Sequence, residues 1–158
     1  MSKKLLDGKV SLVTGAASGI GKATAIEMAK EGASLIIADI EKDKCEAVSE
    51  VITREGGKAF SLPTDVSDED SIVDMVDTIQ SKFGRLDLAF NNAGVGGNFI
   101  KTDECDLEEW TKVISVNLTG VWLCMKHEIQ IMLKNGGGNI VNTASVAGLV
   151  GMGYAPAY

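Results

Sequence analysis

A glycine-rich turn near the start of the chain limits the possible folds more than any other feature of the sequence. Residues 9–14 form a short, apolar, β-prone segment, and residues 20–31 carry apolar side chains near helical spacing. Between them the glycines follow the pattern Gly-x-x-x-Gly-x-Gly, from Gly15 to Gly21. Small residues at these positions allow a tight reversal of the backbone and let it approach a ligand closely. The sequence therefore predicts a strand, a glycine turn and a helix whose N-terminus stays accessible.

The alternation of strand and helix continues along the whole sequence. Apolar, β-prone segments occur at residues 34–39, 58–62, 86–91 and 139–143. Helical patterns separate them, at residues 41–55, from the expected N-cap Ser67 to Gly84, and at residues 107–133. Strands that are apolar on both faces are typical of parallel sheets, and a helix then carries each crossover to the next strand. This order predicts an α/β fold with helices on both faces of one sheet, in a single domain that covers residues 1–158.

Composition and charge exclude several classes of protein. The 158 residues include 15 Lys and Arg against 22 Asp and Glu, a net charge of −7, which disfavours nucleic acids and anionic membranes as partners. No apolar stretch approaches the roughly 18 residues of a membrane helix, and the first residues lack the apolar core of a signal peptide. These features predict a cytoplasmic protein. Cys45, Cys105 and Cys124 are widely spaced and His127 is the only histidine, so no metal site is expected.

The position of the glycine turn indicates a nucleotide cofactor. A helix N-terminus offers free N–H groups and a partial positive charge to a pyrophosphate. Asp39 ends the second predicted strand, 18 residues after Gly21, close to the spacing of about 20 expected of an acid that binds the adenosine ribose. Its carboxylate would accept hydrogen bonds from the ribose hydroxyls and repel a 2′-phosphate. The sequence therefore predicts NAD(H), with NADP(H) as the less favoured alternative because Lys42 and Lys44 lie close by.

The segment Thr14–Gly21 resembles the glycine signature of the classical short-chain dehydrogenase/reductase family. Further segments that resemble motifs of this family follow in the family's order and extend the resemblance over the whole chain: Asp65-Val66, Asn91-Asn92-Ala93-Gly94, Asn117, Ser145 and Tyr158. The family has a Rossmann-type, doubly wound parallel sheet of seven strands. The resemblance implies that this chain contains five of them, in the order 3-2-1-4-5, as a dinucleotide-binding domain.

The resemblance also implies which residues hold the cofactor. In the family, the acid at the position of Asp65 contacts the exocyclic amine of adenine, and the backbone of the residue at Val66 contacts the ring. The segment from Asn91 to Gly94 lines the adenosine side and stabilises the sheet. The residues assigned to cofactor binding in this way are Gly15, Ser18, Gly19, Ile20, Gly21, Asp39, Asp65, Val66, Asn91, Ala93 and Gly94.

The reaction that the resemblance implies is hydride transfer between the nicotinamide and a secondary alcohol or ketone. Tyr158 takes the place of the general acid–base, and Ser145 that of the group that binds the substrate oxygen. Asn117 corresponds to an asparagine that kinks its helix and holds a water in the proton relay. The spacing of 13 residues from Ser145 to Tyr158 fits the family, whereas Tyr154, nine residues after Ser145, fits less well.

The resemblance stops at Tyr158, although the family pattern continues. Family members carry a Lys four residues later, which lowers the pKa of the tyrosine, and two more strands with their helices follow. We therefore expect the domain to be C-terminally incomplete relative to the family, and residues 139–143 to form an edge strand. We expect an NAD-dependent dehydrogenase that forms a homo-oligomer when full length, while the 158-residue chain by itself is expected to be inactive.

Two other functions remain open at this level. The chain could be a truncated NAD-binding module without turnover, which would bind the cofactor but transfer no hydride. It could also be a non-catalytic interaction protein that uses its edge strand for assembly, which would give a stable oligomer and no saturable NADH signal. The enzyme hypothesis predicts a small-molecule alcohol or ketone as partner. The glycine-rich, apolar loops at residues 95–99 and 146–152 favour a largely apolar one.

Overall fold

A five-stranded parallel sheet forms the centre of the computed structural model, which describes residues 4–158. The strands are β1 (Val10–Thr14), β2 (Ser34–Asp39), β3 (Lys58–Pro63), β4 (Leu88–Asn91) and β5 (Asn139–Asn142). Their order in the sheet is β3-β2-β1-β4-β5, and every neighbouring pair is parallel. The predicted fold class and strand order are therefore confirmed, and β5 lies at an edge as expected.

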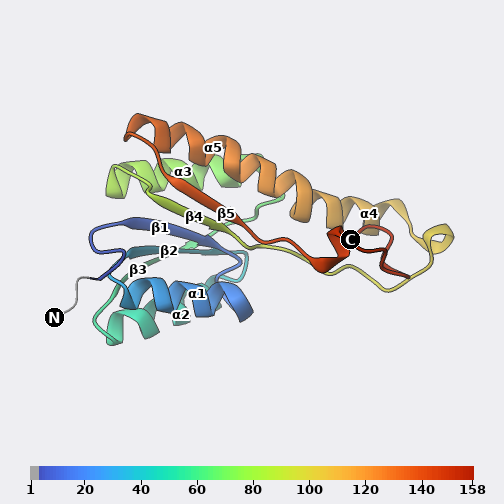
Figure 1. Ribbon diagram of the computed structural model, residues 1–158, viewed down its shortest axis with the longest axis horizontal. Helices are drawn as coiled ribbons and strands as arrows, with labels where there is room; N and C mark the ends of the chain where they lie inside the picture. Colours follow the sequence, from blue (N-terminus) through green and yellow to red (C-terminus); the bar gives the residue numbers. More distant parts are fainter. Residues whose placement is uncertain (1–3) are drawn as a thin grey trace.

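Two helical layers cover the sheet, as Figure 1 shows. The helices α1 (Gly19–Lys30) and α2 (Lys42–Arg54) lie on one face, and α3 (Glu69–Phe83) and α5 (Val121–Lys134) lie on the other. Successive strand residues point to opposite faces, so Leu12 and Ile36 enter the core beneath α3 and α5, whereas Val13 enters the core beneath α1 and α2. Because both faces of the sheet are covered, all five residues of β1 are buried.

Two local predictions need correction. The helix predicted at residues 107–133 is divided into α4 (Leu107–Ile114), a π-helical turn (Ser115–Gly120) and α5. A π turn adds a residue to one turn without breaking the helix, so an apolar helical pattern does not reveal it. The helix α3 begins one residue later than expected, because Asp68 caps it by accepting from the backbone N–H of Asp70.

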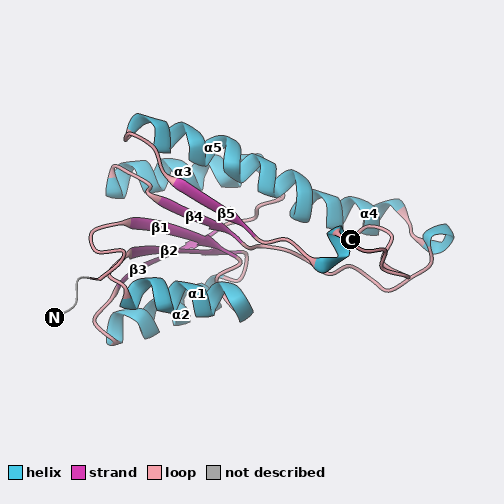
Figure 2. Cartoon of the chain, viewed as in Figure 1, coloured by secondary structure: helices cyan, strands magenta, loops and turns pink. Residues whose placement is uncertain are grey.

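The segments that follow β4 and β5 extend together beyond the sheet towards α4 (Figure 2). The backbone N–H of Ile100 donates to the carbonyl of Tyr154 at 2.8 Å, which ties the two segments together. Each segment, predicted as loop, includes one short 3₁₀ turn, at Thr102–Glu104 and at Val146–Gly148. Within residues 4–158, no helix is long and apolar enough to cross a membrane.

The interior strand β2 offers a test of this core. Ile36 is fully buried between the sheet and the helices α3 and α5. We expect Ile36→Ala to lower the free energy of unfolding by about 2–5 kcal/mol, since it leaves a cavity in a packed core. Denaturant unfolding measures this change. Ile40→Ala is the matched control, because that side chain is 69% exposed, and it should change stability by less than about 0.5 kcal/mol. Equal effects of the two substitutions would contradict the assignment of Ile36 to the core.

Candidate active site

The candidate site lies at the carboxyl ends of the strands, where the strand order reverses between β1 and β4. The turn from β1 into α1 uses left-handed backbone at Gly15 (φ 63°) and Gly19 (φ 51°), which favours glycine. Ser18 caps α1 with extended backbone, and its hydroxyl makes no capping hydrogen bond. The first turn of α1 holds no acidic residue and presents Ile20 to solvent. This arrangement leaves a hydroxyl and free backbone N–H groups for an anionic ligand.

The turn packs directly against the segment that follows β4. A Cβ added at Gly21 would lie 2.2 Å from the carbonyl oxygen of Gly15 and 2.7 Å from Nδ2 of Asn92. A Cβ added at Gly15 would lie 2.8 Å from Cα of Ala93. Side chains are therefore excluded at both glycines, and a shallow cradle of backbone remains at the N-terminus of α1.

Thr14, the last residue of β1, holds this contact in place. Its Oγ1 accepts hydrogen bonds from the backbone N–H groups of Asn92 (3.0 Å) and Ala93 (3.1 Å). The side-chain amide of Asn92 donates in return to the carbonyls of Thr14 and Gly15, each at 3.4 Å. The sequence-based prediction had missed Thr14 as a functional residue. The available signal was its place directly before the first glycine.

Asp39 ends β2 next to the glycine turn. One carboxylate oxygen accepts from the backbone N–H of Ala17 and the other from that of Glu41, both at 3.1 Å. The lysines that kept NADP(H) as an alternative are paired with glutamates, Lys44 with Glu41 and Lys42 with Glu46. The carboxylate is thus held at the edge of the cradle, with no cation directed at it by an ion pair within residues 4–158.

The segment after β3 forms the next wall of the site. Oδ1 of Asp65 accepts from the backbone N–H (2.9 Å) and the hydroxyl (2.7 Å) of Ser67, which explains why Ser67 does not cap α3. Val66 is buried, and its carbonyl oxygen lies 2.6 Å from where a Cβ of Gly120 would be. The π turn therefore packs on the Val66 backbone through a glycine that sequence analysis had not singled out.

Asn91 lies beneath the site and 2% of its surface is exposed. Its Nδ2 donates to Oε2 of Glu128 on α5 and to Oδ1 of Asn142 on β5, both at 3.0 Å. The side chain therefore joins β4 to two other elements. The residues that follow it, Ala93 and Gly94, bring backbone to the surface of the site. Neither Glu128 nor Asn142 was predicted; for Glu128, one polar residue on an amphipathic helix gives no sign of burial.

The three candidate catalytic residues come from two places: Asn117 from the π turn, and Ser145 and Tyr158 from the segment that follows β5. Asn117 sits in the π turn, where Oδ1 accepts from the backbone N–H of Val95 and Nδ2 donates to its carbonyl, both at 2.8 Å. Ser145 lies three residues beyond β5, and its Oγ accepts from the N–H of Ala147. Tyr158 is 48% exposed. Within residues 4–158, no hydrogen bond links these three side chains to one another.

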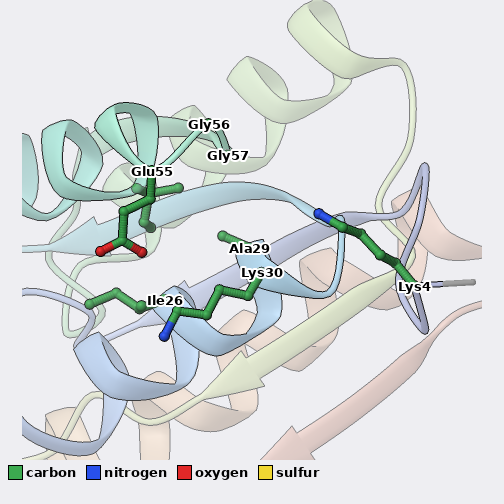
Figure 3. A pocket seen from close by; sticks show the side chains of 8 residues that line it. Lys4, Ile26, Ala29, Lys30, Glu55, Gly56 and Gly57 are labelled. Atoms are coloured by element: carbon green, nitrogen blue, oxygen red, sulfur yellow. The ribbon is translucent and has the colours of Figure 1, made fainter. Parts of the chain in front are cut away.

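Two hollows lie at different distances from the carboxyl ends of the strands, where the candidate site is. A cavity of about 50 Å³ lies at the C-terminal ends of α1 and α2, close to Lys30 and Glu55 (Figure 3). The C-terminal end of a helix repels an anion, and this cavity lies at the amino ends of the strands rather than at their carboxyl ends. It is therefore not part of the site. The second hollow, about 340 Å³, lies between α4 and the C-terminal segment, and its lining consists of Thr102, Cys105, Asp106, Leu107, Trp110 and Pro156. No group of three His, Cys, Asp or Glu side chains among the described residues could hold a metal ion.

Comparison with known sequences gives matches along nearly the whole chain. Residues 9–158 match the family described as short chain dehydrogenase. The chain is 43% identical over 152 residues to a cyclohexanol dehydrogenase of Acinetobacter sp. (strain SE19). This alignment covers 96% of this chain and 60% of that protein. It is 41% identical over 152 residues to a 3beta-hydroxysteroid dehydrogenase of Mediterraneibacter gnavus, with 96% of this chain and 55% of that protein covered. The chain thus spans between half and two thirds of the length of these relatives.

Comparison with solved structures gives the same relationship. The fold superimposes on a crystal structure of NAD⁺-bound xylitol dehydrogenase with a TM-score of 0.94 and 35% sequence identity. The match covers 98% of this chain and 60% of that one. The family match, the identity to curated dehydrogenases and the close superposition together show that this chain belongs to the short-chain dehydrogenase family, a family of oxidoreductases.

Proposed function

We propose that the protein is an NAD(H)-dependent oxidoreductase that interconverts a secondary alcohol and a ketone. The observation that carries this proposal is the pairing of the glycine cradle with Asp39 at the ends of β1 and β2. The carboxylate, oriented by Ala17 and Glu41, would accept hydrogen bonds from the two ribose hydroxyls of adenosine and repel a phosphate there. Because Lys42 and Lys44 are paired with glutamates, neither is free to neutralise a 2′-phosphate without breaking an ion pair.

The residues at the site fit a dinucleotide. Ser18 and the first N–H groups of α1 would hold the pyrophosphate, and Asp65 with Val66 would hold the adenine. The bound nicotinamide would supply the hydride chemistry, and the protein would orient the substrate and handle the proton. In the direction of reduction, the Tyr158 hydroxyl would give its proton to the substrate oxygen, while Ser145 would hold that oxygen by a hydrogen bond. A free tyrosine has a pKa of about 10, so a cation supplied by the full-length protein would be needed near Tyr158 at neutral pH.

An apolar ring alcohol or the matching ketone is the substrate class that we propose. Two relatives are named for cyclohexanol and for a hydroxysteroid, both of which are cyclic secondary alcohols. The hollow beside the C-terminal segment has Leu107, Trp110 and Pro156 in its lining, and Pro156 stands two residues before Tyr158. Such a lining would take up an apolar ring.

We also propose a cytoplasmic homo-oligomer for the full-length protein. The π turn and α5, which together form one continuous helix, expose Leu118 (63%), Trp122 (59%) and Ile129 (41%). Large apolar side chains that gather on one helix are typical of an interface. The negative net charge supports a small-molecule substrate over a nucleic acid or an anionic membrane.

Cofactor titration tests the role of Asp39. We expect NADH to bind at least roughly tenfold more tightly than NADPH, which corresponds to about 1.4 kcal/mol of discrimination. Asp39→Ala should weaken NADH binding and reduce this preference, because it removes both the ribose acceptor and the repulsion of the phosphate. The change in NADH fluorescence measures both constants. Tighter binding of NADPH by the unmodified protein would overturn the assignment of NAD(H).

Substitution of the candidate general acid–base tests the mechanism. In the protein as its gene encodes it, Tyr158→Phe should lower kcat by roughly 100- to 10,000-fold and leave NADH affinity nearly unchanged, because only the proton donor is lost. Tyr154→Phe is the matched control. Tyr154 sits in a left-handed turn (φ 62°) with its side chain 61% exposed, and we expect its removal to leave kcat close to that of the wild type. Retained turnover in Tyr158→Phe would remove this residue from the mechanism.

A protein of only these 158 residues provides a further test. It contains the cofactor residues but no lysine after Tyr158, so we expect detectable, weakened NADH binding and turnover near background. Mass spectrometry confirms the length, and a coupled NADH assay measures the rate with cyclic secondary alcohols. Robust turnover by this form would contradict the requirement for the lysine.

A further inference from the structure

The buried carboxyl of Glu128 has no role in the proposed function. It lies on α5 with no exposed surface, above β4, and its Oε2 accepts from Nδ2 of Asn91 at 3.0 Å. Its other oxygen, Oε1, is buried and has no hydrogen-bond partner among residues 4–158. The same holds for Oδ1 of Asn91, which is also buried. Two bonded side chains therefore each leave one acceptor unsatisfied, which is costly in a core.

A single proton would satisfy both acceptors. A carboxylic acid and a primary amide form a paired, two-bond arrangement when the acid O–H donates to the amide oxygen and the amide N–H donates to the acid carbonyl. The second of these bonds is present between Asn91 and Glu128. The other amide hydrogen of Asn91 is taken by Oδ1 of Asn142 on β5, at 3.0 Å. Oδ1 of Asn91 therefore gains a donor from this pair only if Glu128 is protonated.

We infer that Glu128 is held as the neutral carboxylic acid and that its Oε1–H donates to Oδ1 of Asn91. In this form it acts as a positioning residue for the carboxyl ends of β1 and β4, where the proposed cofactor site lies. The pair fastens α5 to the end of β4, and Asn142 extends the connection to β5. The first residue after β4 is Asn92, which contacts Thr14 and Gly15 in the glycine turn. Ionisation of Glu128 would remove the hydrogen bond between its Oε1 and Oδ1 of Asn91, and two acceptors would then face each other. This change would occur next to the contact of Asn92 with the glycine turn.

The surroundings of Glu128 favour the neutral form. Burial raises the pKa of Glu128 to about 7, against the smaller opposing effect of the Asn91 N–H. Cys124, one turn earlier on α5, stays uncharged because burial and Glu128 raise the pKa of its thiol to about 12. The neighbouring basic side chains on α5, Lys126 and His127, contact Glu69 on α3.

The strands add no opposite charge. The charged residue of the β4 segment, Asp87, lies before the strand at its other end, paired with Arg85 and Lys9. The four residues of β5 and the five of β1 include no charged side chain. Within the described residues, no cation is therefore placed to stabilise an ionised Glu128.

Infrared spectroscopy tests the protonation state directly, in the protein as its gene encodes it. At about pH 6, ordinary carboxyl groups are ionised, so a buried acid should give an isolated carbonyl band. We expect this band in the wild type, its loss with a midpoint at about pH 7, and its absence from Glu128→Gln. Glu69→Gln is the matched control, because that exposed carboxylate is held ionised by Lys126 and His127, and it should keep the band. A wild type without the band, or a band that persists in Glu128→Gln, would overturn the inference.

Unfolding equilibria measure the same proton by linkage. The unfolded chain ionises Glu128 near pH 4.5, whereas the folded protein holds the proton until about pH 7, so the stability that it contributes is complete below pH 4.5 and is lost as the pH rises through about 7. Glutamine keeps one donor and one acceptor at every pH. Relative to Glu128→Gln, the unfolding constant of the wild type should rise by on the order of 100-fold between about pH 4.5 and pH 8. Parallel curves for the two proteins would contradict a proton on Glu128.

Cofactor binding tests the positioning role, and only this part rests on the proposed function. We expect NADH affinity to fall several-fold in the wild type between about pH 6 and pH 8 and to stay level in Glu128→Gln over the same range. An identical pH dependence in both proteins would refute the positioning role. Absence of NADH binding at every pH would instead contradict the proposed function, while the infrared band would still decide the protonation of Glu128.

Discussion

The contact between Thr14 and the backbone of Asn92 and Ala93 is the interaction on which the site depends. It joins the ends of β1 and β4, the two strands between which the order of the sheet reverses. Crossovers leave this point in opposite directions, so a crevice opens there in any doubly wound sheet. The absence of a Cβ at Gly21 lets the turn lie against Asn92, and the crevice becomes a cradle of backbone N–H groups. An anion-binding surface of this kind needs few specific side chains, because the peptide groups supply the donors.

Sequence patterns were sufficient for the parts of the molecule that depend on burial and local backbone. Parallel strands covered on both faces appear as apolar runs, which is why β1 and β2 were placed to within one residue. The glycine turn was equally readable, since its positive φ values demand glycine at Gly15 and Gly19. The π turn was not predicted, because a helical pattern does not show its contacts with distant parts of the chain. In these contacts Asn117 bonds to Val95, and Gly120 packs on the backbone of Val66. Ser67 and Asp68 are both good helix caps, and the bond from Ser67 to Asp65 decided between them.

Glu128 shows a different limit of sequence reasoning. A glutamate on an amphipathic helix is expected at the solvent face, and its burial depends on the turn at which it meets β4. The partner Asn91 belongs to a motif that was assigned to the cofactor, yet its side chain points to α5 and β5. Buried polar groups of this kind add little net stability compared with apolar packing. They do define which side chains meet, since an incorrect register would leave the same groups unsatisfied.

The proposed cofactor site and the candidate catalytic residues differ in how firmly they are held. Asp39, Thr14 and Asn92 each make two or more hydrogen bonds to other residues, so the cradle is organised before any ligand arrives. Ser145 and Tyr158 lie on the segment that follows β5, and the outer part of this segment is tied to the segment after β4 by the backbone bond from Ile100 to Tyr154. Proton transfer requires its donor within hydrogen-bonding distance of the substrate, whereas cofactor binding tolerates movement of these segments. Contacts that order the segments after β4 and β5 should therefore act on the rate of reaction, and contacts at the ends of β1, β2 and β4 on the affinity for the cofactor.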